Sequence, residues 1–330
     1  MRDKIQFSII IPVLNRPYEI KEFLESLSQQ TDKDFEVIIM EGDSIQPCDE
    51  TCKEYSKILN IKHIKNKILS RSIRRNSGIE AAAGNYLIFF DSDCILPTQY
   101  IEIIRKQLNE NYADCFGGID NADKSFNTLQ KAVNCSMTSF FTTGGIRGSA
   151  GKSKNFLPRA FNMGFSKEAY KKVGGYNDII GEDIDLSMRI KEAGFSVRLI
   201  KDAFVYHKRR LTLKKFYMQT YTFGRARVVL SRLHKGSLKI LHLLPVGFTL
   251  GNFLLIVAGI IFCNAWLLLP VATYAIVIFT DSMIKTKKTP ISLLAILTGC
   301  IQLFGYGTGF LDELATRRAS KKSAEKMYRQ

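Results

Sequence analysis

Residues 85–94 read NYLIFFDSDC, in which a run of apolar residues ends in two aspartates. The run is continuous rather than alternating, as expected for a strand that is covered on both faces. Asp91 and Asp93 follow directly, and residues i and i+2 of an extended segment point to the same side. The stretch therefore predicts a buried strand that presents two carboxylates at its carboxyl end.

Other runs of strand length share this character, at 7–14, 35–40 and, more weakly, 113–119. Helical patterns alternate with the runs, near 18–30, 48–58, 71–83 and 98–110. Strands that alternate with helices predict a mostly parallel, doubly wound sheet with helices on its faces. Ligands of such sheets bind beyond the carboxyl ends of the strands, so function is expected at residues in those positions.

The net charge of +16 is unevenly distributed, because residues 201–330 carry 20 Lys and Arg against five Asp and Glu. The first 200 residues are nearly balanced. A nucleic-acid binder usually spreads its basic footprint across its folded domain, so the balance argues against that class.

The stretch 240–280 contains no Asp, Glu, Lys or Arg. These 41 residues are long enough for two helical spans of about 20 residues each, and they lack the polar stripe of a soluble helix. They predict a transmembrane hairpin with its turn at Cys263 and Asn264. A second charge-free stretch, 289–311, is rich in glycine and could span the membrane, re-enter it, lie at its surface or pack against the hairpin.

Basic residues flank the predicted hairpin, including Lys239 before it and Lys285 after it. By the positive-inside rule, both ends of the hairpin are expected in the cytoplasm. The segment 208–239 mixes cations with aromatic side chains, which is typical of an interfacial helix on anionic lipid. The same mixture can bind single-stranded nucleic acid, but the apolar residues that follow favour lipid.

The seven cysteines are scattered, with no Cys-x-x-Cys and only four histidines to complete a zinc site. They are expected to be reduced thiols in a cytosolic compartment. The apolar run that begins at Phe7 is too short for the core of a signal peptide, so the N-terminus is also expected in the cytoplasm.

Two acidic clusters could carry chemistry. The carboxylates of Asp91 and Asp93 suit Mg²⁺ or Mn²⁺ bound together with substrate phosphates, although Asp-x-Asp alone also occurs in ordinary turns. Glu182, Asp183 and Asp185 open a helical pattern, where acids also complement the helix dipole. A carboxylate beside a metal-bound diphosphate would nevertheless suit a general base.

Five segments occur in the order found in family-2 glycosyltransferases of the GT-A fold: FSIIIPVLNR, FEVIIMEGDS, SRSIRRNSGIEAAAGNYLIFFDSDC, NMGFSKEAYKKVGGYND and GEDIDLSMRIKEAGFSVRLIKDAFVYH. The chain resembles that family over roughly residues 5–210. Its C-terminal part, which includes FGYGTGFLDEL, is similar to the tails of membrane-anchored members that build bacterial exopolysaccharides.

The resemblance implies an inverting transfer of a sugar from a nucleotide-sugar, with Mn²⁺ or Mg²⁺ as cofactor. Asp93 would bind the metal, Asp91 would lie near the metal or the ribose, and His207 would complete the metal shell. Asp183 matches the catalytic base, with Glu182 as the second choice, and Asp185 is expected to be structural. The resemblance also assigns residues to nucleotide-sugar binding: Pro12, Asn15, Glu41, Asp43, Arg71, Arg75, Asp91 and Ser92.

The sequence departs from the family after the second strand, where Glu41-Gly42-Asp43 replaces adjacent acids that contact the base. Glu41 is the first choice and Asp43 the second, and the identity of the base stays open. Arg71 and Arg75 precede the strand at 85–91, where a cation could meet base or phosphate, although arginines on a helix are often plain surface residues.

The predicted protein is a multi-pass enzyme of the inner (cytoplasmic) membrane whose catalytic domain faces the cytoplasm. It would transfer a sugar, with UDP favoured as the carrier, to a lipid-linked saccharide or a polyprenyl phosphate during surface polysaccharide biosynthesis, with no nucleic-acid partner. A processive synthase is the alternative, but the sole tryptophan, Trp266, lies in the apolar stretch and not in a Gln-x-x-Arg-Trp motif. A non-catalytic membrane scaffold or nucleic-acid tether would not need both acidic clusters.

Four regions are predicted along the chain: a GT-A catalytic domain at 1–207, a basic interfacial segment at 208–239, membrane segments at 240–311, and a basic cytoplasmic tail at 312–330.

Overall fold

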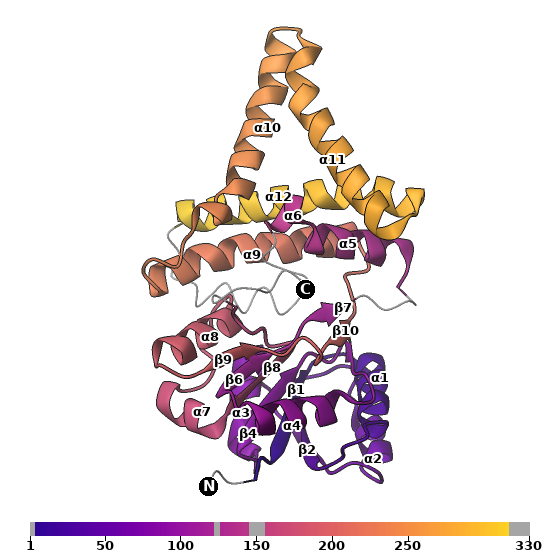
Figure 1. The fold of residues 1–330 in the computed structure, drawn as a ribbon, viewed down its shortest axis with the longest axis vertical. Helices are drawn as coiled ribbons and strands as arrows, with labels where there is room; N and C mark the ends of the chain where they lie inside the picture. The colour runs from indigo at the N-terminus through magenta and orange to yellow at the C-terminus, as the bar shows by residue number, and fades with distance from the viewer. Residues whose placement is uncertain (1–3, 122–125, 145–155, 317–330) are drawn as a thin grey trace. The chain divides into compact units, whose positions relative to one another are not determined.

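The computed structural model describes residues 4–121, 126–144 and 156–316 (Figure 1). The described residues fall into two compact units, 4–121 with 156–207 in the first unit and 126–144 with 208–316 in the second. Most of the predicted basic tail, from residue 317 onward, lies outside the described residues.

The first unit is built on a seven-stranded sheet with the strand order β3-β2-β1-β4-β8-β6-β9. Its strands are β1 (Phe7–Val13), β2 (Phe35–Glu41), β3 (Ile61–Lys65), β4 (Tyr86–Phe90), β6 (Cys115–Gly117), β8 (Asn162–Ser166) and β9 (Val197–Leu199). A second sheet has the order β5-β10-β7, with β5 (Cys94–Ile95), β7 (Asp120–Asn121) and β10 (Val205–His207). The helices of this unit are α1 (Pro17–Ser28), α2 (Asp49–Tyr55), α3 (Arg71–Ala81), α4 (Tyr100–Glu110), α7 (Lys167–Val173) and α8 (Glu182–Glu192).

The four predicted strands and the four predicted helices are confirmed as β1, β2, β4 and β6 and as α1 to α4. Two strands of the main sheet interrupt the simple pattern. β3 is an edge strand paired parallel to β2, and β8 runs antiparallel to both β4 and β6. The sheet is therefore mostly parallel, with one reversed strand between β4 and β6.

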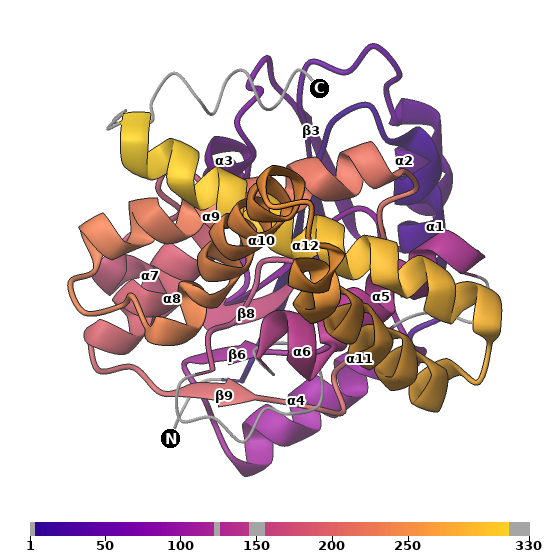
Figure 2. The same cartoon turned by 90° about the horizontal axis from the view of Figure 1, so that it is seen from above.

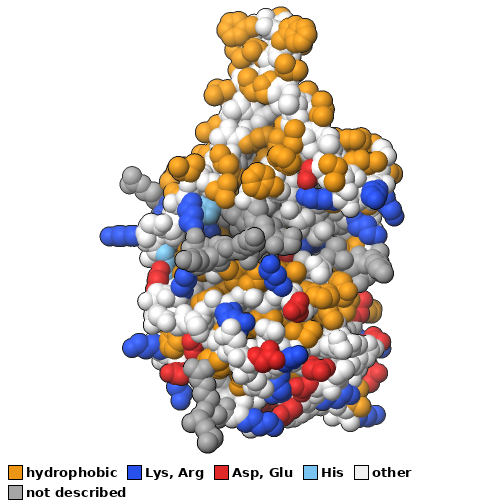
Figure 3. Space-filling view, in the orientation of Figure 1, with side chains coloured by type: hydrophobic (Ala, Val, Ile, Leu, Met, Phe, Trp, Pro, Cys, Tyr) orange, Lys and Arg blue, Asp and Glu red, His pale blue; other side chains and the backbone are white. Residues whose placement is uncertain are grey.

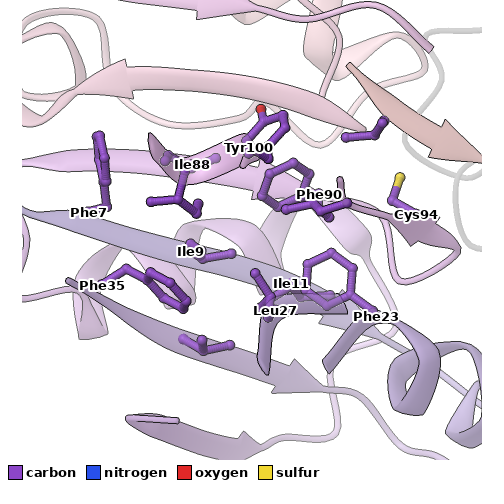
Figure 4. Close-up of a cluster of buried hydrophobic side chains, with 14 of the residues drawn as sticks. Phe7, Ile9, Ile11, Phe23, Leu27, Phe35, Ile88, Phe90, Cys94 and Tyr100 are labelled. Carbon is purple, nitrogen blue, oxygen red and sulfur yellow. The ribbon is translucent and has the colours of Figure 1, made fainter. Parts of the chain in front are cut away.

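The continuous apolar runs are explained by hydrophobic layers on both faces of the sheet. On one face, Ile9, Ile88 and Phe90 pack with Phe23 of α1 and Tyr100 of α4 (Figure 4). The intervening strand residues face a separate cluster on the other side of the sheet, which contains Ile10, Ile38, Leu87, Phe89 and Phe165. Full burial of each large apolar side chain contributes about 1.5–3 kcal/mol. These two layers hold β4 rigidly, and the Asp-Ser-Asp turn follows directly from it.

The second unit is helical. It contains α5 (Thr128–Thr138), α6 (Phe140–Thr143), α9 (Leu213–Leu233), α10 (Leu244–Ile261), α11 (Leu269–Thr286) and α12 (Thr289–Thr316), with short 3₁₀ helices at Ile240–His242 and Ala265–Leu268. The segments Leu244–Ile261, Ala265–Thr286 and Thr289–Thr316 are long and apolar enough to cross a membrane. Hydrophobic side chains cover the α10–α11 hairpin (Figure 3).

The hairpin turns where the sequence predicted. Cys263 adopts a positive φ of 47°, and the side chain of Asn264 accepts a hydrogen bond from the amide of Trp266 at 3.1 Å. Trp266 is 80% exposed. The tip of the hairpin therefore makes few contacts with the rest of this unit.

Helix α12 packs closely against its neighbours at its glycines. A Cβ at Gly305 would overlap the Thr220 hydroxyl of α9, and one at Gly307 would overlap the Thr249 hydroxyl of α10. Such glycines allow two helix backbones to approach closely. Helix α12 also contacts the second helix of the hairpin, because Ile278 of α11 packs with Ala295 of α12. Helix α12 therefore crosses the base of both hairpin helices and extends past them (Figure 2).

A buried ion pair also joins α9 to α12. Nη2 of Arg225 lies 2.7 Å from Oε2 of Glu313, whose side chain is 0% exposed, and Nη1 of Arg232 lies 3.3 Å from Oε1. Removal of one partner from such a pair typically costs about 3–5 kcal/mol, because it leaves a buried charge uncompensated. The pair therefore strongly favours the observed register of the two helices.

The hydrophobic side chains of residues 208–239 are only partly exposed. Phe216, Val228 and Val229 are buried, whereas Leu211 and Leu233 are exposed. The reason is that α9 uses its apolar side within the protein, and Phe216 packs there with hydrophobic side chains of α5.

Candidate active site

The Asp-Ser-Asp turn lies where the two sheets of the first unit meet. Cys94 begins β5, and β5 pairs antiparallel with β10 so that His207 is the partner of Cys94. This register brings Nε2 of His207 to 3.2 Å from Oδ1 of Asp93. Two residues that are 114 positions apart in the chain therefore converge because of a two-residue strand.

Asp93 also contacts a positively charged side chain from the connection between β1 and α1. Nη1 of Arg16 donates a hydrogen bond to Oδ2 of Asp93 at 2.7 Å. The His207 ring is held from the other side by a stacked contact with Phe161, with the ring centroids 4.9 Å apart. Arg16 follows the stretch that contains Pro12 and Asn15, but it is not among the site residues predicted from the sequence.

The groups around Asp93 fit a divalent cation. Ligand atoms of Asp93, Cys94 and His207 lie within 4.8 Å of one another. Burial raises the pKa of the Cys94 thiol well above its ordinary value, so this group is a neutral thiol. The carboxylate and the imidazole are ligand types that Mn²⁺ accepts, whereas Mg²⁺ prefers oxygen ligands alone. These side chains could therefore hold Mn²⁺, or Mg²⁺ with more water ligands.

Asp91 takes part in a separate network that reaches α8. The guanidinium of Arg75 donates from Nη2 to Asp91 at 2.9 Å and from Nη1 to Glu182 at 2.8 Å. Arg75 is 1% exposed, and its guanidinium lies over the ring of Tyr176, 5.1 Å from the centroid. Arg75 therefore bridges the two acidic clusters. Nη1 of Arg71 lies 3.9 Å from Asp91.

The electrostatics of these acids differ. Burial alone would raise the pKa of Asp91, but the charges of Arg71 and Arg75 lower it below its ordinary value. Burial, followed by the neighbouring charge of Asp183, raises the pKa of Glu182 despite the opposing effect of Arg75. Asp91 is therefore held as a carboxylate, whereas Glu182 binds a proton more readily than an ordinary glutamate.

Asp183 is positioned differently from its neighbours on α8. Its Oδ1 accepts a hydrogen bond from the amide of Ile184 at 2.9 Å, and its Oδ2 lies 3.4 Å from the amide of Ala160. No ion pair of Asp183 is found within residues 4–121, 126–144 and 156–316. Asp185 is buried and pairs with Arg189 at 2.9 Å. This contact agrees with the structural role expected for Asp185.

Asn15 shapes the loop that follows β2. It adopts a positive φ of 54°, which asparagine tolerates better than most residues. Its side-chain oxygen accepts hydrogen bonds from the amides of Ile45 at 2.6 Å and Gln46 at 3.2 Å. Pro12 is buried within β1, and Ser92 is buried in the turn after β4. Asn15 therefore ties the end of β1 to the neighbouring loop.

The Glu41-Gly42-Asp43 departure has a structural cause. A Cβ at residue 42 would overlap the guanidinium of Arg74 and lie 2.8 Å from the backbone oxygen of Ile68, so a second acid does not fit there. Glu41 is 1% exposed and turns inward, whereas Asp43 is exposed. Of the two acids proposed to contact the base, Asp43 is the accessible one.

Comparisons with known proteins agree with this architecture. The family model described as Glycosyl transferase family 2 matches residues 8–174. The succinoglycan biosynthesis protein ExoA of Rhizobium meliloti is 25% identical over 93% of this chain and 94% of its own length. A dolichyl N-acetyl-alpha-D-glucosaminyl phosphate 3-beta-D-2,3-diacetamido-2,3-dideoxy-beta-D-glucuronosyltransferase of Methanococcus voltae is 24% identical over 94% of this chain and 98% of its own length.

Other relatives match over less of their length or only in fold. Glycosyltransferase GlyA of Streptococcus pneumoniae is 34% identical over 34% of this chain, and the match spans 16% of that protein. The mannosyltransferase PcManGT of Pyrobaculum calidifontis, solved in complex with GDP-Man and Mn²⁺, aligns with a TM-score of 0.60 and 14% identity over 96% of this chain and 89% of that chain. The fold is GT-A, and this chain belongs to glycosyltransferase family 2.

Proposed function

We propose that this glycosyltransferase is metal-dependent and inverting, and that it transfers a sugar from a nucleotide-sugar to a lipid-linked saccharide or polyprenyl phosphate at the cytoplasmic face of the membrane. One observation carries the proposal. Arg75 bridges Asp91 of the Asp-Ser-Asp turn to Glu182, the neighbour of Asp183. One side chain thereby joins the turn suited to hold a diphosphate to the residue next to the proposed base.

Asp93 and His207 would hold Mn²⁺, or Mg²⁺ with more water ligands. The cation would neutralise charge on the leaving diphosphate, an effect of several kcal/mol in order of magnitude. Asp91, kept ionised by Arg71 and Arg75, would contact the ribose or the metal. The proposed role of these two arginines is therefore to set the charge of Asp91, rather than to contact the base.

Asp183 is the proposed general base. A base must be ionised and able to reach the acceptor hydroxyl. Glu182 is less suited, because it is held by Arg75 at 2.8 Å and its pKa is raised. The Asp183 carboxylate contacts only backbone amides among the described residues. Glu182 would instead keep Arg75, and through it Asp91, in place.

The nucleotide would lie over the loop that Asn15 organises, with Asp43 rather than Glu41 near the base. UDP is the first nucleotide to test. Support for a lipid-linked acceptor comes from the membrane helices and from the names of two relatives that match over 98% and 94% of their own length. One is a glucuronosyltransferase named for dolichyl N-acetyl-alpha-D-glucosaminyl phosphate, and the other is a succinoglycan biosynthesis protein.

The proposed catalytic domain is 1–207, followed by the basic segment 208–239, the membrane segments within 240–311 and the basic tail 312–330.

We propose that only the α10–α11 hairpin spans the bilayer. Helix α12 crosses the base of both hairpin helices and packs along α9. Helix α9 carries Arg225, Arg227 and Arg232. If the hairpin is transmembrane, α12 therefore lies at the cytoplasmic interface.

A cysteine introduced at Asn264 is expected to react with a membrane-impermeant maleimide in intact cells, because the hairpin tip would face outward. Cysteines at Lys239 and Thr316 are expected to stay unlabelled until the cells are opened. The background should lack the native exposed thiol, Cys263. Labelling at both Asn264 and Thr316 would mean that α12 spans the membrane, and labelling at Lys239 and Thr316 but not at Asn264 would reverse the orientation.

The acceptor is tested with membranes that contain the full chain and a panel of radiolabelled UDP-, GDP- and dTDP-sugars. We expect one donor to place label in the organic-extractable lipid fraction in the presence of Mn²⁺, with one sugar added per acceptor. Long polymeric product would support a processive synthase instead. Label that never enters lipid, while a soluble saccharide is glycosylated, would remove the lipid-linked acceptor from the proposal.

A further inference from the structure

A second group of potential metal ligands lies at the start of α2. Sγ of Cys48 is 3.7 Å from Sγ of Cys52 and 3.8 Å from Nε2 of His63. The three ligand atoms lie within 4.8 Å of one another. Both cysteines are at most 2% exposed, and the His63 side chain is 16% exposed. The cluster is therefore compact and largely shielded from water.

Local structure explains how these residues meet. Cys48 immediately precedes α2 and Cys52 is four residues further, so both side chains lie on the same side of the helix. His63 is the central residue of β3, which pairs with β2. Glu41 ends β2, and its Oε2 lies 2.9 Å from Nε2 of His63. A helix and a strand thus supply the three clustered ligands, and a second strand places Glu41 beside one of them.

The distances match those of a tetrahedral zinc site. With Zn–S bonds of about 2.3 Å and Zn–N bonds of about 2.0–2.1 Å, tetrahedral angles place two sulfurs about 3.8 Å apart and a sulfur and a nitrogen about 3.5 Å apart. The observed separations of 3.7 and 3.8 Å are close to these values. The three clustered side chains therefore need little rearrangement to coordinate a cation, whereas Glu41 would exchange its hydrogen bond to His63 for a bond to the metal.

We propose that Cys48, Cys52 and His63 bind Zn²⁺, with Glu41 as the fourth ligand. The two thiols would each release a proton to solvent, so the bound centre would carry two thiolates, one carboxylate, one neutral imidazole and the cation, with a charge of −1. Thiolate and imidazole ligands select zinc over the hard cations suited to Asp93. Asp49 lies 3.9 Å from the other ring nitrogen, Nδ1 of His63, where a metal-bound histidine usually has a carboxylate partner.

The charges around the cluster are compatible with this state. Lys65 forms an ion pair with Asp49, which places a cation near the negative centre. The hydrogen bond to Cys52, together with burial, raises the pKa of the Cys48 thiol, and a coordinated divalent cation reverses such an effect by deprotonating the thiol. In a reducing compartment, clustered cysteines indicate metal binding more often than a disulfide.

A site closed by four protein ligands is structural rather than catalytic. It would fasten both ends of the loop between Glu41 and Cys48, the same loop whose amides at Ile45 and Gln46 bond to Asn15. Zinc would thus rigidify one side of the proposed nucleotide site. Zinc binding at this cluster is independent of the transfer reaction and can be measured without an activity assay.

The test uses the full chain with Cys263→Ser, which removes the exposed thiol, purified in detergent and freed of metal by a chelator. Co²⁺ is the probe, because only thiolate ligands give an intense sulfur-to-cobalt absorption. We expect one equivalent of Co²⁺ to produce this absorption, one equivalent of Zn²⁺ to abolish it, and excess Mn²⁺ to leave it unchanged. Zn²⁺ should also raise the melting temperature.

Cys52→Ser and His63→Asn are the test variants, and each should bind Co²⁺ at least about 100-fold more weakly, since even outer-shell changes cost about 10–100-fold. Cys115→Ser is the matched control, because Cys115 is buried on β6 and not part of the cluster; it should bind as the parent does. Circular dichroism verifies that each variant is folded. If Cys52→Ser does not fold, His63→Asn alone tests the site. A folded parent without thiolate absorption, or undiminished absorption in both test variants, would overturn the zinc site.

Discussion

Replacement of Asp183 by asparagine is expected to lower turnover by about 10²–10⁴-fold and to leave the dissociation constant of the donor almost unchanged. Asparagine keeps the size of the side chain but cannot accept the proton of the acceptor hydroxyl. The donor would be held elsewhere, by the groups around Asp91 and Asp93. Steady-state turnover and donor binding, measured on the same preparation, separate these two effects.

A purely structural role for Asp183 predicts a different result. Asparagine is compatible with the first turn of a helix, so neither stability nor turnover would change much. Glu192→Gln, at the other end of α8, is the control and should behave as wild type. Near wild-type turnover of Asp183→Asn, combined with a large loss in Glu182→Gln, would transfer the role of base to Glu182.

Asp93→Asn is expected to remove the response to metal. The cation is proposed to contribute several kcal/mol to the transfer step, so turnover at saturating donor should fall by at least about 10³-fold. Mn²⁺ should no longer tighten donor binding, and this can be measured by calorimetry with and without the ion. Restoration of wild-type turnover at higher Mn²⁺ would indicate that Asp93 tunes affinity only.

Cys94→Ser distinguishes the ligands of this site. The Cys94 thiol lies within 4.8 Å of the ligand atoms of Asp93 and His207, but burial raises its pKa and so keeps it protonated. The variant should therefore show the Mn²⁺ dependence of the wild type. A weakened response to Mn²⁺ in Cys94→Ser would make the thiol a ligand and would contradict the assignment of Asp93 and His207 alone.

Much of the fold could be predicted because β1, β2 and β4 are buried on both faces and therefore read as continuous apolar runs. β3 lacks this signal, since it is an edge strand whose Lys62 and Lys65 face solvent. β8 begins with Asn162, a polar residue that is buried because its amide donates to the backbone oxygen of Ala203 at 2.8 Å. Local pattern does not reveal a partner that lies 41 residues away.

Some residues of the candidate site could be selected from the sequence in the same way. Position at a strand end indicated Asp91 and Asp93, and the resemblance indicated His207 and Asp183. The partners were not predictable, because Arg75 resembles any other helical arginine until the fold places it between Asp91 and Glu182. Likewise, Cys48 and Cys52 form a Cys-x-x-x-Cys pair rather than Cys-x-x-Cys, and only the fold brings His63 of β3 to them.

The most direct measurement is the Mn²⁺ dependence of donor turnover by the purified full chain. Release of nucleoside diphosphate from the active nucleotide-sugar should stop in excess EDTA and recover when Mn²⁺ is restored, and Asp93→Asn should stay inactive in both conditions. Two results together would contradict metal-dependent transfer at the Asp-Ser-Asp turn. The wild-type protein would keep its full rate in excess chelator, and Asp93→Asn would be equally active.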